Sequence, residues 1–271
     1  MSRAADLRAR FKSLHTEPPL EPTPGILAMP NPWDIGSAKI LAAFGFQALA
    51  TTSAGQAGSL GRNDQAVGRD ALIEHVEVLT ACVDVPFNVD AEDCFADTVE
   101  GVIETVLLLD GTDAAGFSIE DWDPRAGEIR SIGSAVERVA AARSASADLV
   151  LTARAENRLH GITDLDDTIA RLVAYRDAGA DVLYAPALMT LDDITRVVAE
   201  VGAPINVLTL PGTPALPVLA DAGVARVSVG SMFAWAAYGA LADAANELMG
   251  AGTTQYAARM LSADVRNAAF G

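Results

Sequence analysis

DAGADVLYAP (residues 177–186), DAGVARVSVG (221–230) and AFGFQALATT (43–52) share one arrangement of residues. In each stretch a glycine follows a segment of helical periodicity and precedes a short apolar run, so it fits the left-handed position that ends many helices. The apolar run is continuous rather than alternating, as expected for a strand that is buried on both faces of a parallel sheet. The three stretches therefore predict repeated helix-to-strand joints of an α/β fold.

The same alternation extends outward from these joints, from residue 25 to about residue 248, without a linker. Eight apolar runs predict strands, at residues 25–29, 46–52, 85–90, 115–120, 148–154, 181–185, 204–208 and 225–229. Helical patterns lie between them, at residues 34–44, 69–82, 97–109, 133–146, 164–178, 190–200 and 213–222, and a last helix begins near residue 231. Eight such units predict a (β/α)8 TIM barrel, with a doubly wound open sheet as the alternative, since a strand count does not prove closure.

The chain is thus divided into an N-terminal segment (1–24), the barrel (25–248) and a C-terminal helical tail (249–271). The tail contains a Gly-Thr-Thr break and then a weakly amphipathic helix with too few large apolar residues for a domain of its own. Two readings of it stay open. It either caps the barrel or packs as an arm on a neighbouring subunit.

The composition excludes several classes of protein. Hydrophobic residues make up 51% of the 271, which is enough for the core of one large domain. With 19 basic and 36 acidic residues the net charge is −17, which repels nucleic-acid phosphates and anionic lipid head groups. No apolar run approaches the ~18 residues of a membrane span, and the charged N-terminus is unlike a secretory signal. We therefore expect a cytoplasmic protein without nucleic-acid or membrane partners.

Some catalytic residue types are scarce. The three histidines, His15, His75 and His160, are far apart in the sequence, which argues against a zinc site built from imidazoles. The two lysines, Lys12 and Lys39, fall in the N-terminal segment and in a predicted helix, which argues against Schiff-base chemistry at a strand end. Carboxylates, arginines, hydroxyls and backbone groups are left to carry any chemistry.

The carboxyl ends of barrel strands are where active sites form in this architecture. Four predicted strands end in polar runs: Thr51–Gly55, Asp90–Asp93, Glu120–Asp121 and Arg154–Asn157. Charge therefore gathers at three consecutive strand ends, next to a strand that ends in small hydroxyl residues. Tyr184 and Asn206 lie on the following strands, and spacing alone does not decide whether they line the same pocket.

Carboxylates that converge in one pocket raise each other's pKa values unless a cation neutralises them. Asp90 and Glu120, at the ends of their strands, therefore predict a metal ion, and ligation by oxygen alone favours Mg²⁺ or Mn²⁺. Arg154 would bind a substrate carboxylate. Such a site suits a small dianionic oxo-acid, whose enolate a metal ion would stabilise.

The charged strand-end residues also have structural alternatives. Arg154 could form an ion pair with Glu156 at the barrel rim. Asp93 and Asp121 are expected to be solvated loop or helix-cap residues. The stronger metal-site candidates are therefore Asp90 and Glu120.

Four blocks in this order resemble the isocitrate lyase and phosphoenolpyruvate mutase superfamily, over about residues 25–248. They are MPNPWDIGSAKILAAFGFQALATTSAG (29–55) with SLGRND (59–64), NVDAED (88–93), SIED (118–121) and LTARAEN (151–157). The resemblance implies a (β/α)8 barrel that binds Mg²⁺ and an α-oxocarboxylate and makes or breaks a C–C or P–C bond beside it. It also implies a homotetramer, a dimer of dimers that exchanges C-terminal helices.

The resemblance also implies roles for single residues. Asp90 and Glu92 match the family's Asp-Ala-Asp metal motif, and Asp64 matches an acidic position near the metal. Together with the strand-end argument, this gives three sets: metal binding by Asp90, Glu92 and Glu120; substrate binding by Thr51, Thr52, Ser53, Arg154 and Asn206; and catalysis by Arg154, Thr52 and Asp64.

One block departs from the family. Isocitrate and methylisocitrate lyases carry a Lys-Lys/Arg-Cys-Gly motif after the fourth strand, whereas this chain reads DWDPRAGEIRSIGSAVE (121–137), with neither Lys nor Cys. The gating-loop lysine of the mutase and phosphonopyruvate hydrolase branches is also missing. We therefore expect a Mg²⁺-dependent lyase that uses a different proton donor to cleave or decarboxylate a small 2-oxo or 2-hydroxy acid, resembling oxaloacetate or methylisocitrate. The alternatives are P–C bond chemistry and a non-catalytic metabolite-binding barrel.

Overall fold

The computed structural model describes residues 2–17, 19 and 22–271, and its centre is a single parallel sheet of eight strands. The strands are β1 (Leu27–Met29), β2 (Leu49–Ala50), β3 (Phe87–Asp90), β4 (Gly116–Glu120), β7 (Val150–Arg154), β8 (Val182–Tyr184), β9 (Ile205–Leu208) and β10 (Arg226–Ser228). Each lies inside the run predicted for it. Their spatial order, β1-β10-β9-β8-β7-β4-β3-β2, follows the sequence around a circle.

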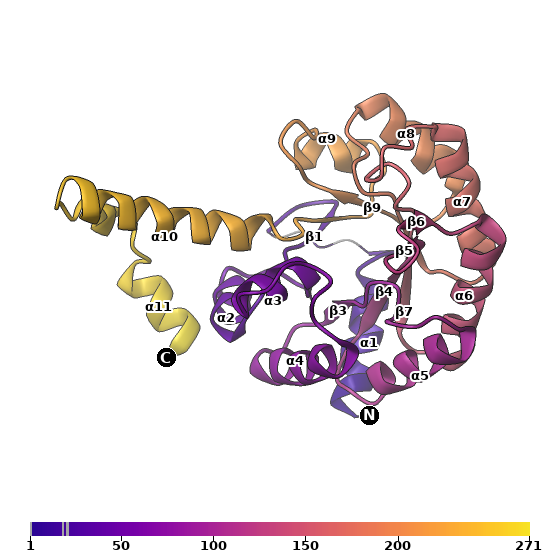
Figure 1. Cartoon of the computed structure of the whole chain (residues 1–271), viewed down its shortest axis with the longest axis horizontal. Coiled ribbons are helices and arrows are strands. Elements are labelled where there is room, and N and C mark those ends of the chain that lie inside the picture. Colours follow the sequence, from indigo (N-terminus) through magenta and orange to yellow (C-terminus); the bar gives the residue numbers. More distant parts are fainter. Residues whose placement is uncertain (1, 18, 20–21) are drawn as a thin grey trace.

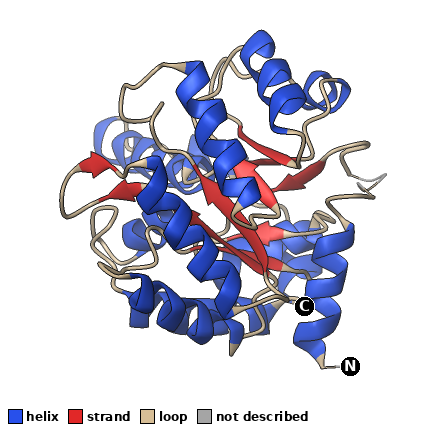
Figure 2. Cartoon of the chain, turned by 90° about the vertical axis from the view of Figure 1, so that its right-hand side faces the viewer, coloured by secondary structure: helices blue, strands red, loops and turns tan. Residues whose placement is uncertain are grey.

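The circle is nearly closed. The first and last strands of the ladder, β1 and β2, are joined where the backbone N–H of Ala50 donates to the carbonyl oxygen of Pro30 at 3.1 Å. Helices surround the strands on the outside (Figures 1 and 2). The predicted TIM barrel is therefore confirmed, and the open-sheet alternative is wrong.

The outer helices also match the predicted segments. They are α2 (Ile35–Ala43), α4 (Arg69–Cys82), α5 (Val99–Asp110), α6 (Ile132–Ala145), α7 (Leu165–Asp177), α8 (Leu191–Val201), α9 (Leu216–Asp221) and α10 (Met232–Gly250). The glycines of the three quoted joints, Gly45, Gly179 and Gly223, have φ of +86°, +107° and +82°. These left-handed values are the ones that the helix-to-strand pattern predicts.

A helix not predicted from the sequence, α1 (Arg3–Ser13), closes the amino-terminal end of the barrel. Leu7, Phe11 and Leu14 are buried and form one cluster with inward-facing strand residues such as Val150. A Cβ at Gly116 would lie 2.8 Å from the Phe11 ring, so the glycine makes room for that ring. The spacing of these three apolar residues, i, i+4 and i+7, is the helical signal that the sequence carried.

Two further short elements lie near the carboxyl ends of the strands. Helix α3 (Ser53–Ser59) follows β2 directly, and a small hairpin of β5 (Trp122–Asp123) and β6 (Glu128–Ile129) follows β4. The Trp122 ring stacks on His160, with ring centroids 3.5 Å apart. The hairpin is thereby linked to the loop that follows β7.

The last helices leave the barrel. Helix α10 projects away from it, followed by the 3-10 helix η1 (Gln255–Arg259) and by α11 (Ala263–Phe270), which contacts α2 (Figure 1). Large apolar side chains on α10 are exposed, including Trp235, Leu241, Leu248 and Met249. Among the helices of the described residues, none combines the length and the apolar character needed to cross a membrane.

Candidate active site

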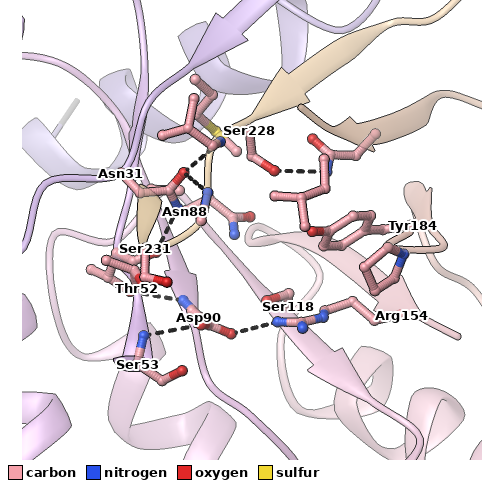
Figure 3. A pocket seen from close by; sticks show the side chains of 18 of the residues that line it. Asn31, Thr52, Ser53, Asn88, Asp90, Ser118, Arg154, Tyr184, Ser228 and Ser231 are labelled. Atoms are coloured by element: carbon pink, nitrogen blue, oxygen red, sulfur yellow. Dashed lines mark hydrogen bonds and ion pairs between the residues drawn. The ribbon is translucent and has the colours of Figure 1, made fainter. Parts of the chain in front are cut away.

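A cavity of about 190 Å³ opens at the carboxyl ends of the strands (Figure 3). Six of the residues predicted from the sequence line it: Thr51, Thr52, Ser53, Asp90, Arg154 and Asn206. The other three predicted residues, Asp64, Glu92 and Glu120, do not line this cavity. Glu120 lines a smaller adjoining space together with Arg154.

Arg154 is shared by three carboxylates. Its guanidinium lies 2.7 Å from Asp90, 3.3 Å from Glu120 and 2.8 Å from Glu156, measured between nitrogen and oxygen atoms. The register of the sheet explains the convergence, because Glu120 pairs with Arg154 across β4 and β7. The ion pair with Glu156 thus exists, but as one of three. Burial nevertheless raises the pKa values of Glu120 and Glu156 above their ordinary values.

The end of strand β2 is tied to Asp90. The backbone N–H of Ser53 donates to a carboxylate oxygen of Asp90 at 3.1 Å, and the backbone N–H of Asp90 donates to the Thr51 hydroxyl at 2.8 Å (Figure 3). The Thr52 hydroxyl caps α3 by accepting from the N–H of Gly55 at 3.3 Å. These contacts fix the carboxylate of Asp90 between β2 and Arg154.

Glu92 is a buried acid beside this cluster. Its backbone has φ +48°, in the left-handed region that costs a non-glycine residue free energy. No residue of the described ranges forms a hydrogen bond with its side chain. Burial, reinforced by the charges of Asp90, Asp64 and Asp93, raises the pKa of Glu92 to about 8. Asp64 itself lies on an exposed loop.

Two acids expected to be solvated are buried, so that expectation was wrong. Asp93 forms ion pairs with Arg125, Arg130 and Arg138, which fix the loop that follows β3. The reason is that a buried carboxylate needs several donors, and residues distant in the sequence supply them.

Asp121, the second of these acids, joins β4 to its neighbours. It accepts hydrogen bonds from the Tyr175 hydroxyl at 2.6 Å, from Arg171 at 3.1 Å and from the backbone N–H of Glu156 at 2.8 Å. Burial nevertheless raises the pKa of Asp121 above its ordinary value. Through its bond to Glu156, Asp121 helps to orient the acid that pairs with Arg154.

The predicted metal ligands do not form a ready cluster. Within residues 2–17, 19 and 22–271, no group of three or more His, Cys, Asp or Glu side chains is arranged to bind a metal ion. Asp90 and Glu120 instead share Arg154. The donor set still suits a hard divalent cation, because it consists of carboxylates and because no Arg, Lys or His among the described residues forms an ion pair with buried Glu92.

The sequence prediction missed a polar layer inside the barrel. Inward-facing residues below the strand ends are Asn88, Ser118, Thr152, Arg226 and Ser228, all of them buried. Their signal in the sequence is the polar residue at alternate positions of strands such as FNVD (87–90) and FSIE (117–120), which the description of these strands as continuous apolar runs overlooks. Asn31 was also missed; its side chain joins β1 to Thr51, Val229 and Gly230 through hydrogen bonds.

A nearly closed barrel of eight parallel strands, with a polar cavity at its carboxyl end, defines a TIM-barrel protein whose cavity lies where enzymes of this fold bind their substrates. The sequence model of the phosphoenolpyruvate phosphomutase family matches residues 11–249, so the chain belongs to that family. The resemblance noted in the sequence is thereby confirmed.

Several individual proteins are similar to this chain, and two of them are named for an activity. An uncharacterised protein of Mycobacterium tuberculosis is 32% identical over 206 residues, 75% of this chain and 77% of the relative. A 2-methylisocitrate lyase of Aeropyrum pernix is 28% identical, over 71% of this chain and 65% of that protein. An oxaloacetate decarboxylase of Pseudomonas fluorescens is 27% identical, over 59% and 56%. The superfamily therefore contains lyases as well as mutases.

A solved structure covers nearly the whole chain. A Burkholderia cenocepacia protein, described provisionally as a lyase/mutase, is 46% identical and superimposes with a TM-score of 0.92 over 98% of this chain and 97% of that one. The agreement extends the fold assignment to regions outside the barrel strands.

Proposed function

We propose that the protein is a divalent-cation-dependent lyase that breaks a C–C bond next to the carbonyl or hydroxyl carbon of a small carboxylic acid, through an enolate intermediate. The observation that carries the proposal is the convergence of Arg154 with Asp90 and Glu120 at one wall of the cavity. An arginine held by acids at adjacent strand ends can exchange one of them for a substrate carboxylate. The protein would act in the cytoplasm.

The residues of the chain divide the work as follows. Arg154 binds and orients the substrate carboxylate, while Ser53 and Thr51 hold Asp90 in place. Asp90, Glu92 and Glu120 would hold Mg²⁺ or Mn²⁺, and exposed Asp64 would add negative charge near it. When bound, the cation would polarise the carbonyl and stabilise the enolate. Leu159 and Pro186 contribute apolar side chains to the lining of the cavity.

The carbon that leaves as an enolate must receive a proton. Because the chain lacks the Lys and Cys of the lyase motif, we assign this role to Tyr184, whose phenol is the most acidic hydroxyl lining the cavity. Its ring faces the Arg154 guanidinium at 5.2 Å from the ring centroid. Burial raises the pKa of Tyr184 to about 12, so the phenol keeps its proton at neutral pH and can donate it.

The substrate class follows from the relatives that carry an activity in their names. Relatives named 2-methylisocitrate lyase and oxaloacetate decarboxylase support a C–C bond substrate with two or more carboxylates. P–C bond chemistry is the second candidate, because the matching family is named for a phosphomutase. Oxaloacetate, 2-methylisocitrate and phosphonopyruvate together separate these possibilities.

The test is turnover of these three acids with Mg²⁺, Mn²⁺ or neither. Pyruvate formed from oxaloacetate or 2-methylisocitrate reports C–C cleavage. Conversion of phosphonopyruvate to phosphoenolpyruvate, or to pyruvate and phosphate, reports P–C bond chemistry. We expect cation-dependent pyruvate formation that is lost in Asp90→Asn and Arg154→Gln. Arg196→Gln is the matched control, because Arg196 pairs with Asp166 and Glu200 on the exposed face of α8. Conversion of phosphonopyruvate to phosphoenolpyruvate or phosphate, without pyruvate from the other two acids, would favour the second candidate.

A further inference from the structure

We propose that Arg226 and the neutral groups around it form a second anion subsite on the floor of the cavity, which binds the far carboxylate of a dicarboxylate substrate. This inference rests on the proposed function, because it names the substrate class of the same site. Arg226 lies inside the barrel, at the start of β10 and not at a carboxyl end of a strand.

The middle layer of side chains inside this barrel is unusual because it is polar. Barrel interiors are ordinarily filled by layers of branched apolar side chains. Here the amino-terminal end is apolar, where α1 inserts Phe11, but the layer above it is polar and includes the following residues: Asn88, Ser118, Thr152, Tyr184, Asn206, Arg226 and Ser228. All of these except Thr152 line the cavity. The cavity therefore has a polar floor inside the barrel.

Arg226 is a buried cation without an acidic partner. It is 2% exposed, and no Asp or Glu of the described ranges lies within ion-pair distance of its guanidinium. Its nitrogens donate to Asn206 at 3.0 Å and to Thr152 at 2.9 Å, and a third nitrogen lies 3.2 Å from His15. A guanidinium has five N–H groups, so two of them have no hydrogen-bond partner among the residues that the structure describes. Burial lowers its pKa to about 9, which still leaves it charged at neutral pH.

His15 orients Arg226 without neutralising it. The Nδ1 atom of His15 lies 2.8 Å from the carbonyl oxygen of Phe11, so this nitrogen carries the proton and Nε2 accepts from Arg226. Burial, together with the charge of Arg226, lowers the pKa of His15 to about 3, which keeps the ring neutral. The partners of Arg226 are thus all neutral. An unneutralised buried charge is costly, and a bound anion would offset that cost.

Asn88 gives a second, independent indication of a ligand. Its side chain is buried and lines the same cavity, yet its amide oxygen has no hydrogen-bond partner in the part of the chain that the structure describes (Figure 3). Buried polar atoms are nearly always paired in folded proteins. A ligand that offers a hydroxyl group would satisfy this oxygen while its carboxylate binds Arg226.

The two arginines are suited to the two ends of one small molecule. Thr152, which Arg226 contacts, lies two residues before Arg154 on the same face of β7. At a rise of about 3.3 Å per residue, this separates the two levels by roughly 7 Å along the strand. A ligand held at both levels carries two anionic groups joined by a short carbon chain.

The experiment compares binding of succinate with binding of butyrate, which has the same number of carbons and one carboxylate. We expect wild-type protein to bind succinate at least about tenfold more tightly by isothermal titration calorimetry, as a charged hydrogen-bonded contact predicts. Arg226→Gln should remove this preference and leave butyrate binding unchanged. Arg226→Lys should retain part of it. Equal preference in wild type and Arg226→Gln would overturn the subsite.

Wild-type protein gives a second test in case Arg226→Gln does not fold. In ¹H–¹⁵N spectra the buried Nε–H of Arg226, assigned by its absence in Arg226→Lys, should shift with succinate and not with butyrate. An unchanged resonance at saturating succinate would also overturn the subsite. Succinate preference without turnover of any acid would count against the proposed lyase and leave the subsite intact. Turnover that Arg226→Gln does not change would count against the subsite and leave the proposed lyase intact.

Discussion

Tyr184 is the residue that we propose as the proton donor, and a single substitution tests this role. Tyr184→Phe removes only the hydroxyl and keeps the ring that lies over Arg154. If the phenol donates the proton, turnover should fall by about 100-fold, as for loss of a general acid. Calorimetric binding of oxalate with Mg²⁺ should stay unchanged. Undiminished turnover in Tyr184→Phe would assign the proton donor to another group.

His15 predicts a pH dependence of stability. Its pKa is about 3 in the folded protein and near 6.5 when unfolded, so folding excludes a proton that the unfolded chain binds. The contribution of neutral His15 to the free energy of unfolding is therefore fully present above pH 6.5 and is lost as the pH falls toward 3. The variant His15→Gln can still accept a hydrogen bond from Arg226 but does not titrate. Relative to this variant, wild type should lose a few kcal/mol of unfolding free energy at most over this pH range, since each pKa unit is worth about 1.4 kcal/mol.

Urea unfolding of both proteins at several pH values between 7 and 3.5 measures this difference. The carboxylates titrate in both proteins, so their contribution cancels in the comparison. A difference in unfolding free energy that does not change with pH would contradict a neutral, buried His15.

The candidate residues differ in how far the sequence could predict them. Asp90 and Arg154 end their strands, and the end of a strand can be read from an apolar run followed by charge. Arg226 sits inside a strand, where its direction depends on the register with β9 and β1. Register is set by tertiary pairing, which one sequence does not reveal. The side-chain partners of buried Asp93 and Asp121 could not be predicted either, because they come from the hairpin region, α6 and α7, which only tertiary packing brings to these acids.

At the scale of elements, α1 acts as part of the barrel core and not as an appendage. Phe11 is fully buried against the inward face of the strands. Phe11→Ala should therefore lower the free energy of unfolding by about 3 kcal/mol, as for other large-to-small substitutions in cores. Phe44→Ala is the matched control, because that ring is 56% exposed. Equal effects of the two substitutions in urea unfolding would show that α1 does not seal the barrel.

The elements that the sequence predicted well are those with strong local signals. Eight strands and eight outer helices follow from apolar periodicity and from glycines at helix ends. The short α3 and the β5–β6 hairpin were missed because two to seven residues carry too little periodicity to read. Their positions are fixed by long-range contacts, such as the ion pair of Arg125 with Asp93.

At the scale of the whole molecule, an apolar space lies against the outward-facing residues Ala28 of β1 and Val227 of β10. An apolar cavity of about 400 Å³ lies there, lined by residues that include Ala28, Val227, Val229 and Phe233. Helix α10 would close this gap in a simple barrel, but it projects away and exposes Trp235 and other apolar side chains (Figure 1). We propose that partner subunits exchange these helices in a homotetramer, a dimer of dimers.

Light scattering after size-exclusion chromatography tests the assembly. We expect a mass about four times the 28.1 kDa of one chain. Replacing Trp235 and Leu241 with Asp should reduce the mass, because charge on an apolar interface costs free energy. Asp243→Asn, on the same helix, serves as the control. A monomer at micromolar concentration would contradict the proposed exchange.

The proposed enolate site consists of Asp90, Arg154 and a divalent cation, and thermal unfolding with Mg²⁺ and oxalate tests whether it forms. Oxalate is a planar dianion that resembles the enolate of pyruvate. Ligand at about 100 times its dissociation constant adds about 2.7 kcal/mol of stability, a clear rise in melting temperature. We predict that the rise requires both components, is absent in Asp90→Ala and Arg154→Ala, and persists in Arg196→Ala. No rise in wild type with both present would contradict the site.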